Sequence, residues 1–126
     1  MAVISAIVQQ ISANSLYIKY EGLGNADSGE VVGGTSSLDN LRLTKNTAIY
    51  PDKTVIISGT WGGATAVFEG SVDGENWLTL NDIEGSPLSF TEDSKFKVIL
   101  ENPLFIRVST SGGTGTDLDA VIIASN

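Results

Sequence analysis

The chain has 126 residues, a length that suits one domain with a single hydrophobic core. Its net charge is −8, from 7 basic and 15 acidic residues. Because the chain is acidic and has no Lys/Arg cluster, binding to nucleic acid or to an anionic membrane surface is not expected. It contains no cysteine and no histidine, which excludes disulfides, thiolate chemistry and histidine-based catalytic triads.

The first segment, residues 1–14, carries five aliphatic side chains and no charged one. These side chains are Val3, Ile4, Ile7, Val8 and Ile11. Their spacing suits either a first strand of the domain or an apolar arm that packs on a neighbouring molecule. An arm of this kind is expected to be poorly ordered until its partner is present, because burying the side chains must offset the entropy lost on ordering.

From residue 15 onward, short apolar runs alternate with Gly, Asn, Asp and Ser, a pattern typical of an all-β domain. The expected strands cover residues 15–20, 30–32, 53–60, 64–71, 76–81, 87–91, 95–101, 103–110 and 117–124. Residues 33–47 are expected to form a long loop or an added hairpin. No stretch of the body sustains a helical apolar period, so residues 15–126 are predicted to form one antiparallel, jelly-roll-like β-sandwich with minimal helix.

Alternation of side chains along each strand predicts which residues face inward. The expected core residues are Val55, Ile57, Trp77, Phe96, Val98, Ile106 and Val108. Leu100 continues the inward side of 95–101, and Trp77 is expected to fill space between the two sheets.

Catalytic and metal-binding patterns are not found. The carboxylates lie mostly in turn-rich stretches, where Asp and Glu are ordinary turn residues, so no enzymatic activity is expected. The stretch GGTGTDLDA at 112–120 partly matches a calcium-binding nonapeptide, but Asp119 occupies the position of a large apolar residue and the pattern occurs once. The sequence therefore predicts no catalytic residue, no metal ligand and no cofactor.

A longer pattern covers most of the chain beyond residue 20. It comprises EGLGNADSGEVV (21–32), YPDKTVIISGTWGGATAVFEGSVDGENWLTLND (50–82), PLSFTED (87–93) and ILENPLFIRVSTSGGTGTDLDAVII (99–123). In this order and spacing the chain resembles a family of small tailed-bacteriophage virion proteins, which are generally taken to be capsid decoration (cement) proteins or other structural components with a β-sandwich fold. Residues 1–14 and 33–47 depart from the family's pattern.

The resemblance implies a protein made in the host cytoplasm that binds the outer surface of the phage head and stabilises the shell by bridging capsomers. Its expected partners are the major capsid protein and other copies of itself, most simply as a homotrimer, with no nucleic acid and no membrane. The five aliphatic side chains of residues 1–14 are then the expected capsid or subunit contacts. The alternative is a carbohydrate-binding sandwich on a phage tail, fibre or head, which would use Trp61, Tyr50 or the turn at 72–77.

Overall fold

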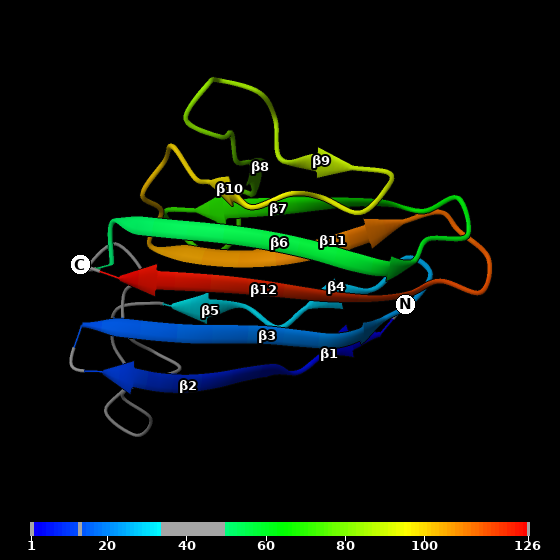
Figure 1. The fold of residues 1–126 in the computed structure, drawn as a ribbon, viewed down its shortest axis with the longest axis horizontal. Coiled ribbons are helices and arrows are strands. Elements are labelled where there is room, and N and C mark those ends of the chain that lie inside the picture. Colours follow the sequence, from blue (N-terminus) through cyan, green and yellow to red (C-terminus); the bar gives the residue numbers. More distant parts are fainter. Residues whose placement is uncertain (1, 13, 34–49, 126) are drawn as a thin grey trace.

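The computed structural model describes residues 2–12, 14–33 and 50–125. These residues form two β-sheets packed face to face, with almost all strand pairs antiparallel (Figure 1), so the predicted all-β sandwich is confirmed. The described part of the chain contains no helix, and therefore none that could cross a membrane. The predicted loop or hairpin over 33–47 lies, from residue 34 on, outside the described residues.

One sheet has five strands in the order β10-β6-β12-β3-β2. Its strands are β2 (Ala6–Ser12), β3 (Ser15–Leu23), β6 (Asp52–Thr60), β10 (Lys97–Val98) and β12 (Asp117–Ser125). The long strands lie side by side in Figure 1, with the C-terminal β12 between β3 and β6. Every pairing in this sheet is antiparallel.

The other sheet has seven strands and follows the path β1-β4-β11-β7-β8, with β5 also paired to β11 and β9 to β7. Its strands are β1 (Val3–Ile4), β4 (Ser28–Gly29), β5 (Val32–Gly33), β7 (Thr65–Ser71), β8 (Leu78–Thr79), β9 (Ser89–Phe90) and β11 (Phe105–Ser111). The longest pairing, between β7 and β11, runs from Phe105 opposite Ser71 to Ser111 opposite Thr65.

The N-terminal segment belongs to both sheets. Strand β1 pairs with β4 in the seven-stranded sheet, and after Ser5 the chain continues as β2 beside β3 in the five-stranded sheet. The amide of Ala6 donates to Oε1 of Glu30 at 2.9 Å, which fastens this crossing point. Residues 3–4 and 6–12 thus form strands at the side of the sandwich.

The core lies between the sheets and follows the predicted alternation in the long strands. Val55, Ile57, Ile106 and Val108 are fully buried there, on β6 and β11. Tyr20 is buried as well, and its hydroxyl donates to the backbone oxygen of Glu30 at 2.8 Å. Burial raises the pKa of this phenol above its usual value, because the charged phenolate would lose its hydration.

The prediction for residues 95–101 was wrong. Phe96, Val98 and Leu100 are 74%, 39% and 57% exposed, whereas Ile99 is buried in the core. The register explains the difference, because Val98 lies opposite Thr54, which alternates with the inward-facing Val55 on β6. Val98 therefore lies on the outward side of the five-stranded sheet, and Phe96 and Leu100, which flank β10, are exposed.

The prediction that Trp77 fills space between the sheets was also wrong. Trp77 is half-buried, and the guanidinium carbon of Arg107 lies 4.1 Å from the centroid of its ring. Arg107 alternates with the inward-facing Ile106 and Val108 on β11, so it lies on the outward side of the seven-stranded sheet. Trp77 therefore packs on the outside of that sheet, where a cation over its ring replaces core packing.

Candidate interaction surfaces

Two carboxylates in the turn-rich stretches, Asp73 and Asp82, hold turns in place. Both oxygens of Asp73 accept hydrogen bonds, from the amides of Glu75 and Asn76 at 2.8 Å each and from Nδ2 of Asn76 at 2.6 Å. These bonds to the charged form hold the pKa of Asp73 well below its usual value. Gly74, with a φ of 78°, supplies the left-handed residue that this turn requires.

Asp82 has a similar role at the next turn. It is buried, and its Oδ1 accepts from the amides of Glu84 and Ser86 at 2.9 and 3.0 Å. Lys97 lies 3.9 Å from the other oxygen. Within the described ranges, no group of three or more acidic, histidine or cysteine side chains is arranged to hold a metal ion. The hydrogen bonds of Asp73 and Asp82 thus account for the local turn structure.

The aromatic residues considered for sugar stacking are engaged elsewhere. Tyr50 is fully buried beside Leu16 and Ala124 in a small second core. Trp61 is half-buried against the main core, and its indole Nε1 donates to Oδ1 of Asp93 at 2.8 Å. Tyr50 thus offers no face to a sugar, and the two rings do not form a common platform.

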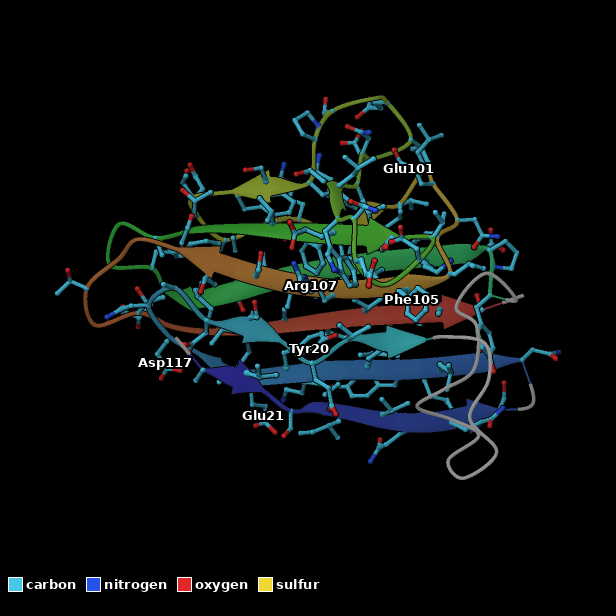
Figure 2. The ribbon with its side chains drawn as sticks, turned by 180° about the vertical axis from the view of Figure 1, so that it is seen from behind. Tyr20, Glu21, Glu101, Phe105, Arg107 and Asp117 are labelled. Carbon is cyan, nitrogen blue, oxygen red and sulfur yellow. The ribbon has the colours of Figure 1, made fainter. Side chains whose placement is uncertain are left out.

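The turn at 72–77 folds back over the outward side of the seven-stranded sheet. A Cβ atom at Gly74 would lie 3.6 Å from Cζ of Phe105, and Trp77 stacks on Arg107. Nε of Arg107 also donates to Oε1 of Glu69 at 3.0 Å. Figure 2 shows Arg107 and Phe105 from this side of the molecule. The turn therefore lies against the sheet through Gly74 and Trp77, whereas Val72, Asp73, Glu75 and Asn76 are exposed.

The first candidate interaction surface is the outward side of the five-stranded sheet, which we call the outer face. The strand register places its side chains in two rows across the sheet. One row holds Ile7, Lys19, Val121 and Ile56, and the next holds Gln9, Tyr17, Ile123, Thr54 and Val98. Ile7, Ile123 and Val98 are exposed on this face, so apolar side chains reach the solvent from β2 at one edge of the sheet to β10 at the other.

The second candidate surface is a pocket beside β8, which we call the β8 corner. The pocket has a volume of about 390 Å³. It is lined by Gly70, Ser71, Val72, Asn76, Leu78, Thr79, Leu80, Asn81, Glu101, Asn102 and Pro103. Val72 and Leu78 are 74% and 77% exposed, while Leu80 and Pro103 are buried. An aliphatic side chain from a partner would find apolar contacts on several sides here.

Hydrogen bonds preform this pocket. The carboxylate of Glu101 accepts from the backbone amide of Asn81 at 2.7 Å and from its Nδ2 at 2.6 Å, which ties the segment after β10 to the segment after β8. Gly70 makes the close approach possible, because a Cβ atom there would lie 2.7 Å from Leu80 and 2.8 Å from Pro103. The pocket was not predicted from the sequence, although Val72 and Asn76, which line it, belong to the turn at 72–77 that was considered for sugar binding.

A buried lysine lies behind the β8 corner. Lys53 is 1% exposed, on the inward side of β6, and its Nζ donates to Oδ1 of Asn102 at 2.6 Å. Burial lowers the pKa of Lys53 from 10.5 to about 8, against the opposing effect of Asp52. Lys53 was not predicted to be buried, because a lysine at an alternating strand position is usually exposed.

The predicted contact residues of the N-terminal segment separate into two groups. Ile4 and Val8 pack against the core and are only partly exposed. Val3, Ile7 and Ile11 are exposed, and Ile7 belongs to the outer face. A role in contacts with a capsid or a neighbouring subunit remains a prediction for the exposed three.

No known protein-family model matches the chain, and no curated protein matches it. Among solved structures, the SPBc2 prophage-derived protein YomS matches with a TM-score of 0.61 and 11% sequence identity, over 94% of this chain and 100% of YomS. The protein NMB1881 from Neisseria meningitidis matches with a TM-score of 0.39 and 10% identity, over 96% of this chain and 83% of that protein. The likeness to YomS shows that the two chains share a fold over nearly their whole length.

Proposed function

We propose that this protein is a structural component of a bacteriophage particle: a decoration protein that binds the outer surface of the capsid and stabilises the shell by bridging capsomers. The observation that carries the proposal is the presence of two separate exposed apolar surfaces, the outer face and the β8 corner, on one small sandwich. A protein that bridges needs at least two contact surfaces and no catalytic group. The whole-length likeness to a prophage-derived protein supports the phage part of the proposal.

The β8 corner is the surface proposed to contact the major capsid protein. Its rim is acidic, because Asp73 and Glu75 lie on the adjoining turn and Glu101 lines the pocket. No lysine or arginine is among the residues that line it. The matching partner surface is an extended segment that inserts an aliphatic side chain and carries a neighbouring basic residue.

The test uses the phage whose genome encodes the protein. Particles lacking the protein are expected to assemble. On heating, they should release their DNA at a lower temperature than complete particles. When the salt concentration is lowered stepwise, they should release it at a higher salt concentration than complete particles. Adding the purified protein back should restore resistance, whereas a Val72→Lys, Leu78→Lys variant should not, because it places two cations in the apolar pocket. Ile83→Lys is the matched control, since Ile83 is an exposed apolar residue outside the pocket.

Cryo-electron microscopy of the complete particles provides the second readout. Density for the sandwich is expected on the outside of the head, with the β8 corner toward the shell. Particles that lack the protein and keep full resistance to heat and low salt would rule out the stabilising role. Density on the tail in place of the head would rule out decoration of the capsid.

A further inference from the structure

The β8 corner is an open end of the hydrophobic core. Leu78 lies opposite the buried Gly70 and two residues before the buried Leu80, so its side chain is on the inward side of the seven-stranded sheet. It is nevertheless 77% exposed. Leu80 and Pro103 line the same pocket and are buried. An apolar side chain that enters the pocket would therefore extend the core and cover apolar surface that now meets solvent.

The pocket runs along a free strand edge. Residues 78–81 all line it, and their side chains alternate between the two sides of the sheet, so the pocket follows the edge of β8. The amide of Leu80 donates to the backbone oxygen of Phe68 at 2.9 Å. In an antiparallel ladder this bond makes the adjacent pair, Glu69 and Thr79, a pair that is not hydrogen-bonded. The N–H and C=O of Thr79 therefore point away from β7, and Thr79 is exposed.

The next position on this edge shows how it binds another stretch of chain. Asn81 also points its backbone groups away from β7, and both have partners. Its N–H donates to Oε1 of Glu101 at 2.7 Å, and its C=O accepts from the amide of Leu100 at 2.8 Å. Thr79 offers the same donor and acceptor one position further along. An extended peptide can therefore continue the row of backbone hydrogen bonds at Thr79.

The charge around the pocket selects among extended peptides. Glu101 lines the pocket, Asp73 and Glu75 are exposed on the adjoining turn, and no lysine or arginine is among the lining residues. The whole chain carries a net charge of −8, which adds long-range attraction for a cationic segment. A peptide with lysine or arginine beside its aliphatic residue is therefore favoured, and an acidic peptide is repelled.

We propose that the β8 corner binds an extended basic segment of its partner, which adds to β8 as an extra strand. The backbone of the segment pairs with Thr79, one aliphatic side chain enters the open end of the core, and a neighbouring lysine or arginine lies against the acidic rim. Backbone bonds then supply affinity, and the pocket and rim supply specificity. In assigning the segment to the major capsid protein, this inference rests on the proposed function.

A random library of twelve-residue peptides displayed on yeast tests the proposal. Peptides are selected on the wild-type protein and counter-selected on Leu78→Lys, which places a cation at the exposed pocket wall. The enriched peptides are expected to carry an aliphatic residue near lysine or arginine and to be depleted in aspartate and glutamate. Failure to enrich any peptide overturns the proposal, and enrichment of acidic peptides overturns its charge argument.

Titration calorimetry with one synthesised, enriched peptide then tests the strand pairing. Thr79→Pro removes the N–H that faces the partner and keeps the bonds to β7, so it should raise the dissociation constant at least about fivefold. Thr79→Ala keeps the backbone groups and should leave the constant unchanged. Ile83→Lys, outside the pocket, is the control for Leu78→Lys, which should raise the constant at least about tenfold. Raising sodium chloride from about 20 to about 300 mM should weaken binding.

Equal affinity of Thr79→Pro and Thr79→Ala for the peptide would overturn strand addition, and a peptide that Leu78→Lys binds as well as the wild type would place binding elsewhere. None of these measurements uses phage particles. Peptide binding by a protein that does not protect particles would overturn the proposed function alone. Protection of particles by a protein that binds no peptide would overturn this inference alone.

Discussion

The buried Lys53 makes the stability of this protein depend on pH in a direction that can be worked out from its surroundings. In the folded state its pKa is about 8, and in the unfolded chain it returns to 10.5. Between these values the unfolded chain binds a proton that the folded protein has released. Raising the pH therefore favours the folded state, and the contribution of Lys53 to stability increases from about pH 8 until the pH exceeds 10.5.

The magnitude follows from the same two values. Each pKa unit corresponds to 1.36 kcal/mol, so the free energy of unfolding should rise by about 2 to 3 kcal/mol between pH 7 and pH 10 because of this residue alone. Lys53→Met keeps most of the side-chain volume and removes the titrating group. At pH 7 the variant loses the bond to Asn102 but also the cost of burying a charge, so it is expected to be at least as stable as the wild type.

Urea unfolding, followed by the fluorescence of Trp61 and Trp77, measures the effect at several pH values. The quantity to compare is the stability of the wild type minus that of Lys53→Met, since other titrating groups, including Tyr20, cancel in the difference. This difference should rise by about 2 to 3 kcal/mol from pH 7 to pH 10. Lys95→Met, which removes an exposed lysine in the same way, is the matched control. A flat difference for Lys53→Met would refute the assigned burial cost.

Three further substitutions test the packing of the sandwich. Gly29→Ala should lower the free energy of unfolding by about 1 to 3 kcal/mol in urea, because its Cβ would lie 2.6 Å from the ring of Tyr20. Trp77→Ala should cost about 1 to 2 kcal/mol, through the lost stacking on Arg107, and a cost near that of a fully buried tryptophan would contradict its place outside the sheet. Asp73→Ala should lower the melting temperature at pH 7. That loss should shrink as the pH falls below 3.8, the usual pKa of the group, since its folded pKa is depressed and its stabilisation disappears in acid.

The core of the long strands was predictable because their patterns leave little choice. Strand β6 alternates Val55 and Ile57 with Thr54 and Ser58, and each set can face only one way in a sandwich. The same holds for Ile106 and Val108 on β11, where Arg107 occupies the other side. This alternation can be read from the strand's own sequence. The set of residues that faces the core therefore stays the same whichever strands pair with it.

The misassigned residues lie where local information is ambiguous. In residues 96–100, Phe96, Val98 and Leu100 alternate with Lys97 and Ile99, so one side is wholly apolar and the other carries a lysine. Only the register against β6 decides which side is buried, and the pairing partner lies more than 40 residues away in the chain. For Trp77 the missing information was the cation beneath its ring, since Arg107 is distant in sequence.

The candidate surfaces were beyond sequence reasoning for the same reason. The outer face draws its side chains from five strands between Ile7 and Ile123, so no stretch of sequence displays it. The β8 corner depends on Glu101 meeting Asn81 and on the missing side chain of Gly70. An alternating apolar pattern predicts that a side is apolar, but whether that side is covered is decided by the packing of the two sheets.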